Sequence, residues 1–130
     1  MHKFRVWDEE TSRMYSGNNA IVTFNGVLEE VYVRNINTIN ELIDYKLMKS
    51  TRFADKEVNE IYEGDIVKTS AGAIGIIKFG RYSTMDINGD NNIGFYIEWK
   101  LDISMRVDLG YWLERISVIG NIYENPELLR

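Results

Sequence analysis

The chain has 130 residues, 45% of them hydrophobic and 27% charged, a balance that predicts one ordinary globular domain or two small ones. It contains no cysteine, which excludes disulfides, thiolate metal sites and cysteine nucleophiles. The formal net charge of −5 disfavours, without excluding, a surface that binds nucleic-acid phosphates.

The first third of the chain is predicted to consist of strands. Residues 4–7 alternate apolar and charged side chains, the period of a half-buried strand, and Met14-Tyr15 is a candidate for the antiparallel partner. Residues 21–24 are β-branched and aromatic, Asn25-Gly26 is a strong hairpin signal, and residues 27–33 form the natural return strand. This hairpin is the clearest local prediction.

A short helix is expected after the hairpin. Thr38 and Glu41 fit a capping box, and the aliphatic residues that follow Thr38 have helical spacing. We therefore expect a helix over residues 38–45 and then a strand over residues 46–51.

A charged segment divides the chain. Residues 52–59 are rich in charge and poor in strand formers, so we place a domain boundary here, between residues 1–57 and residues 58–130. Beyond the boundary, strand patterns alternate with glycine turns; the predicted strands are residues 66–69, 73–79, 95–99 and 118–123. Gly75 lies inside one of them, which indicates a bulge or close packing. Short strands at this spacing predict a small β-barrel or roll.

Three stretches of the chain resemble one protein family. They are KFRVWD at residues 3–8, EIYEGDIV at residues 60–67 and VIGNIYENPELL at residues 118–129. In this order and spacing they are similar to the YopX family of phages and prophages of Gram-positive bacteria. The resemblance implies a phage-encoded accessory protein with an SH3-like roll in its C-terminal half. It brings no catalytic residue, substrate or cofactor with it.

The resulting fold prediction is mainly β, or β-rich α+β. The C-terminal half is expected to be the SH3-like β-roll or barrel, and the N-terminal half a smaller β-rich unit with one short helix. The chain departs from the family at one turn, because Val58 stands where the family usually has glycine. We expect this turn to be remodelled.

Two groups of side-chain oxygens are candidates for chemical sites. Asp86, Asn88 and Asp90 alternate as the first ligands of a calcium loop do, but the loop lacks the bidentate glutamate and the flanking helices. Glu63 and Asp65 could be a catalytic pair, but no third partner is visible, and Asp65 is expected to accept backbone hydrogen bonds. We therefore expect no metal site, and a turn role for both groups.

No enzyme is expected. The sequence has no phosphate loop, dinucleotide fingerprint, zinc pattern or nucleophile–histidine arrangement. His2, the only histidine, lies at the chain end and is expected to have no functional role. We expect no cofactor.

A cytoplasmic location is expected. No signal peptide precedes the chain's strands, and no apolar run approaches the ~20 residues of a membrane helix. We therefore expect no membrane partner.

The predicted function is binding of a protein partner, from host or phage, or a second copy of the chain. Tyr111 and Trp112 are candidates for exposed aromatic contacts, although burial in the core is the commoner fate of such residues. Leu128 and Leu129 form either a docking segment or a tail packed on the domain. The alternative function is nucleic-acid binding by a small β-barrel. Its candidate residues are Lys68, Lys78, Arg81, Lys100 and Arg106.

Overall fold

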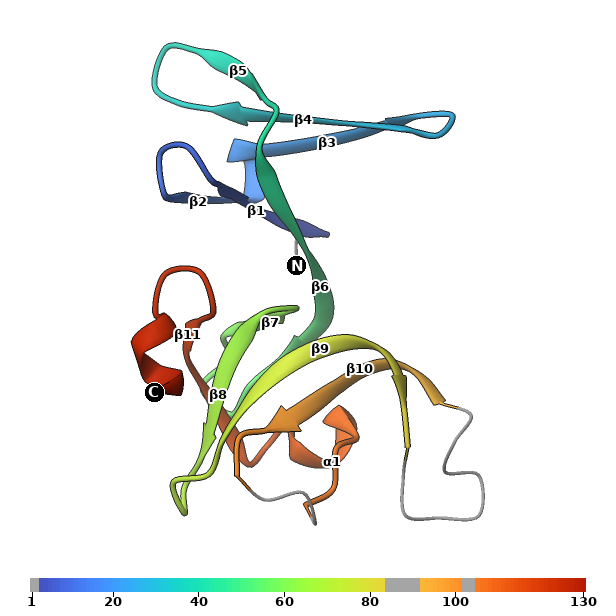
Figure 1. Ribbon diagram of the computed structural model, residues 1–130, viewed down its shortest axis with the longest axis vertical. Helices are drawn as coiled ribbons and strands as arrows, with labels where there is room; N and C mark the ends of the chain where they lie inside the picture. The colour runs from blue at the N-terminus through green and yellow to red at the C-terminus, as the bar shows by residue number, and fades with distance from the viewer. Residues whose placement is uncertain (1–2, 84–91, 102–104) are drawn as a thin grey trace. The chain divides into compact units, whose positions relative to one another are not determined.

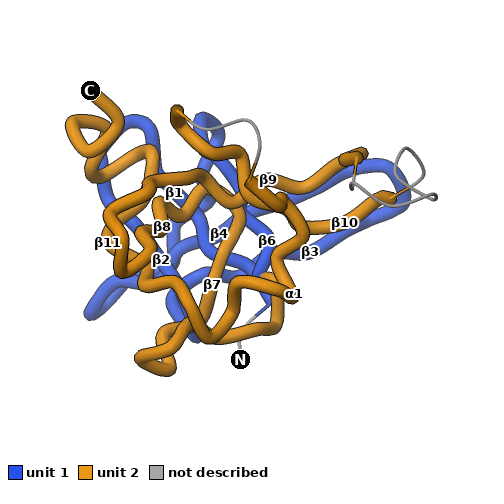
Figure 2. Tube along the Cα trace, turned by 90° about the horizontal axis from the view of Figure 1, so that it is seen from below, with its two compact units in different colours: residues 1–50 blue, residues 51–130 orange. Residues whose placement is uncertain are grey.

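The computed structural model describes residues 3–83, 92–101 and 105–130. By its contacts the chain divides into two compact units, Met1–Ser50 and Thr51–Arg130, coloured separately in Figure 2. Strands dominate both units, so the prediction of a mainly β fold is confirmed.

Unit 1 contains two antiparallel sheets (Figure 1). Its strands are β1 (Phe4–Asp8), β2 (Arg13–Ser16), β3 (Ala20–Asn25), β4 (Leu28–Arg34), β5 (Ile39–Leu42) and the first part of β6 (Tyr45–Ala54). A single 3-10 turn, η1 (Gly17–Asn19), connects β2 to β3. Strand β1 lies between β2 and β6, and β4 lies between β3 and β5. The expected antiparallel pairing of the first strand with the segment that holds Met14 and Tyr15 is present, with Trp7 opposite Met14.

The core of unit 1 follows the alternation of its strands. Val31 and Val33 point to the same face of β4, and both are buried. Val6 of β1 and Met48 of β6 are buried as well. Burial of these aliphatic side chains provides the main stabilisation of such a small unit.

The predicted helix over residues 38–45 is wrong. Residues Ile39–Leu42 form β5, which pairs with β4 from Val31↔Leu42 to Arg34↔Ile39. An eight-residue helix is marginal without a packed face, whereas the adjacent edge of β4 offers a complete ladder to an extended chain. The strand predicted after it is confirmed as part of β6.

The hairpin of β3 and β4 has a two-residue turn, one position later than the Asn-Gly signal suggests. Asn25 pairs with Leu28, so Gly26 and Val27 are the central residues. Gly26 has φ +64°, whereas Val27 does not have a positive φ. A positive φ at the first central residue alone matches a type II′ turn.

Unit 2 is built on a curled antiparallel sheet with the order β10-β9-β8-β11 (Figure 1). Its elements are β7 (Glu60–Tyr62), β8 (Asp65–Thr69), β9 (Ile74–Tyr82), β10 (Asn92–Trp99), the single-turn helix α1 (Leu109–Trp112), β11 (Ile116–Asn121) and the 3-10 helix η2 (Pro126–Leu129). The inner face of the curl holds the core, which consists of Ile61, Val67, Ile77, Ile97, Trp99, Leu109 and Ile116. The expected roll in the C-terminal half is confirmed.

Each outer strand of this sheet forms a backbone hydrogen bond to a neighbouring segment of unit 2. The Ile97 N–H of β10 donates to the Val107 carbonyl at 2.8 Å. On the other side, the Lys56 N–H donates to the Ile116 carbonyl of β11 at 3.2 Å. At these positions the edge groups are bonded within the unit and are not available to a strand of another chain.

Gly75 shows the close packing that the sequence indicated. A Cβ atom at this position would lie 2.5 Å from Cγ2 of Ile97 and 3.0 Å from Cε3 of Trp99. The ladder between β9 and β10 is continuous here, so no bulge is present. Glycine allows the two strands to bring Trp99 over the core.

Helices are short throughout the part of the chain that the structure describes, and none there is long and apolar enough to cross a bilayer.

Candidate functional site

Two of the three signature stretches meet within unit 2. The Ile122 N–H donates to the Gly64 carbonyl at 3.0 Å, and Asp65 pairs with Asn121 across β8 and β11. Asp65 is buried, and its carboxylate accepts the Tyr62 N–H at 2.7 Å. The expected acceptor role of Asp65 is confirmed. Gly64 has φ +89°, the conformation that a turn here demands of glycine.

The C-terminal stretch forms a hydrogen-bonded loop. The Asn121 side-chain oxygen accepts the N–H groups of Tyr123 and Glu124, and the Asn125 side-chain oxygen accepts the Asn121 N–H. A Cβ atom on Gly120 would lie 2.5 Å from that Asn125 oxygen, so this position accepts only glycine without rearrangement. These residues hold the loop together through their own hydrogen bonds.

Asp55 is the centre of a third polar cluster in unit 2. Its buried carboxylate accepts the N–H groups of Glu57, Asn59 and Val118 at 2.8–2.9 Å. Burial alone would raise the pKa of Asp55, but these hydrogen bonds outweigh it and lower the pKa. The cluster joins the segment after β6 to β11. It was missed in the sequence because it lies within the charged segment that we assigned to a domain boundary.

The strongest candidate for a binding surface lies around α1. We call it the aromatic–arginine cluster, and it consists of Arg106, Tyr111, Trp112 and Arg115. The guanidinium carbons of Arg106 and Arg115 each lie 4.4 Å from the centre of the Tyr111 ring. Tyr111 also meets Trp112 edge-to-face, with ring centres 5.0 Å apart. Cations over aromatic faces and edge-to-face rings are both favourable arrangements.

The cluster is held in place by hydrogen bonds. The indole N–H groups of Trp99 and Trp112 both donate to the Arg106 carbonyl, at 2.7 and 2.9 Å. The Arg106 side chain is fixed by two bonds to the Asp108 carboxylate, and Arg115 donates to the Tyr111 carbonyl. The side chains of the cluster are therefore oriented before any partner arrives.

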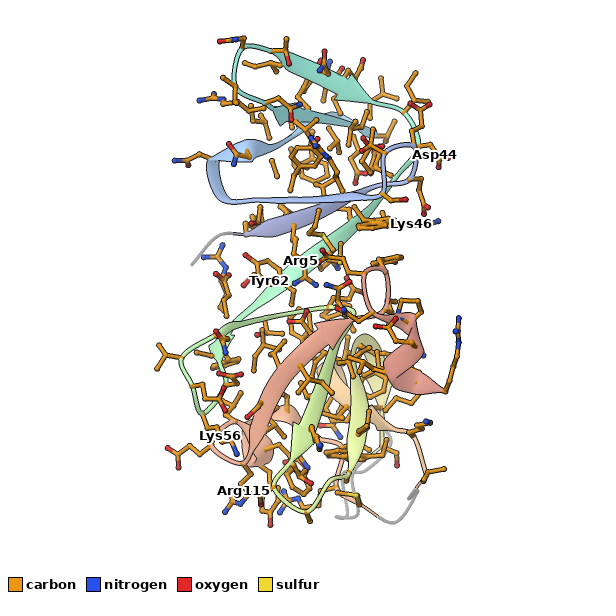
Figure 3. All side chains as sticks on the ribbon, turned by 90° about the vertical axis from the view of Figure 1, so that its left-hand side faces the viewer. Arg5, Asp44, Lys46, Lys56, Tyr62 and Arg115 are labelled. Carbon is orange, nitrogen blue, oxygen red and sulfur yellow. The ribbon has the colours of Figure 1, made fainter. Side chains whose placement is uncertain are left out.

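The cluster is accessible. Tyr111 is 38% exposed, Trp112 is half-buried, and Arg106 and Arg115 are exposed. Figure 3 shows Arg115 at the surface of unit 2. Among the residues that the structure describes, no carboxylate pairs with Arg115.

An apolar pocket shares a wall with the cluster. Trp99, whose indole binds the Arg106 carbonyl, also lines a cavity of about 150 Å³. The other lining residues are Gly72, Ala73, Ile74, Lys100, Leu101 and Met105. Leu101 is 90% exposed at this pocket. The pocket is large enough for one aliphatic side chain of a partner.

The other predicted contact residues lie elsewhere. Leu128 and Leu129 belong to η2 and are half-buried. Figures 1 and 2 place η2 and α1 at separate positions on unit 2, so the four predicted contact residues do not form one surface.

The five cations of the nucleic-acid alternative are not combined into one patch. Lys78 and Arg81 point to opposite faces of β9, because they are three residues apart in a continuous ladder. Lys78 pairs with Glu98 at 2.8 Å, a bond that raises the pKa of Lys78. Arg106 pairs with Asp108, and Lys100 donates to the Arg130 carbonyl. Lys68 is exposed on β8.

The predicted calcium loop, with Asp86, Asn88 and Asp90, lies outside the described residues, as does His2. Within residues 3–83, 92–101 and 105–130, no three or more acidic, histidine or cysteine side chains gather as a metal site would require.

Comparisons with known proteins find similarity over nearly the whole length of the chain. A family model described as "YopX protein" matches residues 3–130. No curated protein matches the chain. Three chains of solved structures match it. One of them is the crystal structure of protein EF1440 from Enterococcus faecalis, which is similar at 25% identity and a TM-score of 0.62, with 100% of this chain and 99% of that chain covered.

Proposed function

The chain belongs to the YopX family, and from this premise we propose that it is a non-enzymatic accessory protein, encoded by a phage or prophage, that binds a protein partner in the host cytoplasm. The aromatic–arginine cluster is the observation that supports this proposal. Tyrosine, tryptophan and arginine are the residue types that carry most binding energy in protein interfaces.

The cluster also suggests the chemistry of the partner. Arg115 is exposed and has no carboxylate partner among the described residues, so an acidic side chain of the partner would complete it. The adjacent pocket would receive an aliphatic side chain. Because the surface is oriented in advance, little side-chain entropy is lost when the partner binds.

The test begins with capture of host and phage proteins on the tagged chain, from lysates with and without nuclease treatment. Any captured protein is then purified and titrated against the chain by calorimetry. We expect Tyr111→Ala to weaken its binding about tenfold or more, since central aromatic contacts are each worth over 1 kcal/mol. Phe53→Ala is the matched control, because Phe53 is an exposed aromatic residue of unit 2 outside the cluster.

Equal affinity of the Tyr111→Ala and Phe53→Ala variants would contradict a role for the cluster. Capture that depends on intact nucleic acid would favour the alternative function, a small β-barrel that binds nucleic acid. Turnover of a small molecule by the purified chain would overturn the non-enzymatic assignment.

A further inference from the structure

We propose that strand β3 is a contact between two copies of this chain, pairing antiparallel with β3 of the second copy around a twofold axis at Val22. This surface belongs to unit 1. It is independent of the aromatic–arginine cluster, and either proposal can fail without the other.

Strand β3 is an unprotected edge. The sheet order is β3-β4-β5, and no strand among the described residues pairs with the outer side of β3. Its ladder with β4 runs without a bulge from Ala20↔Val33 to Asn25↔Leu28. Edge strands are normally protected by charge, proline, bulges or short length.

None of these protective features is present in β3. The strand has six residues, AIVTFN, and lies in a run from residue 14 to residue 28 without a single charged side chain. The edge strands β2 and β5 of the same unit have only four residues each, with Arg13 in one and Glu41 in the other. A neutral edge is compatible with a second copy of itself, because pairing two copies brings no like charges together.

The turn geometry determines which backbone groups of β3 point outward. In a two-residue hairpin the flanking residues, here Asn25 and Leu28, exchange both hydrogen bonds. Alternate residues then bond to β4, so Ala20, Val22 and Phe24 direct their backbone groups away from it. The structure agrees at one position, where the Ala20 N–H donates to the Gly17 carbonyl instead of β4.

A twofold axis at Val22 matches these outward groups. This axis places Val22 opposite Val22 of the second copy and Ala20 opposite its Phe24. The backbone N–H and carbonyl groups of all three residues point away from β4. The two Val22 residues exchange both bonds, and each Phe24 N–H reaches the partner's Ala20 carbonyl. An axis at Ile21 or Thr23 would oppose residues whose backbone groups are already bonded to β4.

Side-chain sizes are also complementary about this axis. Ala20, Val22 and Phe24 increase in size along one face, so the antiparallel copy places its largest residue against the smallest. A groove of about 270 Å³ runs along this face, lined by Lys3, Phe4, Gly17, Ala20, Val22 and Phe24. Phe24 is 58% exposed in the single chain. The space beside Gly17 and Ala20 would accept the Phe24 ring of the second copy.

Disulfide trapping tests the register directly, because the chain has no cysteine of its own. In a hydrogen-bonded antiparallel pair the Cα atoms are about 5.5 Å apart, within disulfide range. Val22→Cys is therefore expected to form covalent dimers under mild oxidation. Thr23→Cys would place its two Cα atoms about 8 Å apart, beyond that range. Ile36→Cys, fully exposed in the same unit, measures random collision.

Sedimentation equilibrium of the unmodified chain provides the second measurement. We expect a dimer at about 100 μM, and a monomer with unchanged circular dichroism after Val22→Lys places two ammonium groups on the axis. If Val22→Lys does not fold, the proposal is tested by the sedimentation mass of the wild type and by the crosslinking of the cysteine variants. A monomeric wild type, or a dimer in which Val22→Cys crosslinks no faster than Ile36→Cys, would overturn the proposal. Trapping of a strand from another protein on β3 would overturn it as well.

Discussion

Val58 has a backbone conformation that β-branched residues avoid. Its φ is +66°, and its side chain is 84% exposed, so little packing offsets a strain of about 1–2 kcal/mol. The sequence led us to expect a remodelled turn here. The structure instead contains a reverse turn, closed by the Val58 N–H on the Asp55 carbonyl at 3.0 Å, and Val58 itself adopts the glycine-like conformation.

Val58→Gly is expected to raise the free energy of unfolding by about 0.5–1 kcal/mol, because removal of the strain exceeds the added entropy of the unfolded chain. Urea unfolding measures the change. Val27→Gly is the matched control, since Val27 is also an exposed turn valine but has no positive φ. A gain in the control equal to that at Val58 would refute the explanation by strain.

Asp55 makes the stability of unit 2 depend on pH. Its pKa in the folded chain lies below the ordinary value of 3.8, so the ionised carboxylate stabilises the fold above that pH. The contribution is lost as the pH falls from 3.8 through the lowered folded value. Asp55→Asn is expected to cost about 2 kcal/mol or more near neutral pH, with the cost shrinking in acid.

Urea unfolding across a pH series, on wild type and variant, tests this expectation. Glu114→Gln removes the same charge from an exposed residue and should have little effect at any pH. A gap between wild type and Asp55→Asn that stays constant in acid would show that the Asp55 charge is not responsible.

Residue types alone identified half of the aromatic–arginine cluster. Tyr111 and Trp112 belong to the residue types favoured in interfaces, whereas Arg106 is a candidate of the nucleic-acid alternative and no sequence pattern points to Arg115. Arg115 follows Tyr111 by four residues but lies beyond the end of α1 at Trp112, in the turn that leads to β11. No helical pattern in the sequence connects the two residues, because the single turn of α1 has only four residues.

At the scale of elements, β9 and β10 can approach closely only because position 75 has no side chain. Gly75→Ala is expected to lower the free energy of unfolding by about 1–3 kcal/mol, since the added methyl overlaps Ile97 and Trp99. Thermal or urea unfolding measures the loss.

Gly94→Ala is the matched control in the same strand pair. Its Cβ would find its nearest neighbour at 3.9 Å, so the substitution should be neutral or slightly stabilising. Equal losses at both positions would indicate a general effect of glycine replacement and would contradict the packing explanation.

Strands with local signals were predicted, whereas elements that depend on distant partners were not. The β3–β4 hairpin carries its alternation and its turn residues within a short segment. Residues 39–42 have helical spacing when read alone, and only the free edge of β4 makes them a strand. The same limit explains why the turn was placed one residue early, because Asn25-Gly26 does not reveal which two residues are central.

For the whole molecule, the pairing of cations with carboxylates bears on the nucleic-acid alternative. The net charge is −5, and Lys78 and Arg106 are paired with Glu98 and Asp108. We expect no binding of single-stranded DNA by fluorescence anisotropy at about 0.15 M salt, and little at lower salt. Binding that weakens steeply with added salt would restore the alternative.

The positions of the three tryptophans give each unit an optical signal of its own. Trp7 belongs to unit 1, whereas Trp99 and Trp112 lie 5.0 Å apart in unit 2. Trp7→Phe would therefore leave an emission spectrum that reports on unit 2 alone, and the coupled pair should dominate the near-ultraviolet circular dichroism. Comparing the denaturation curve of the wild type, whose emission includes Trp7 of unit 1, with that of Trp7→Phe, whose emission comes from unit 2 alone, would reveal whether the two units melt as a single cooperative body or one after the other.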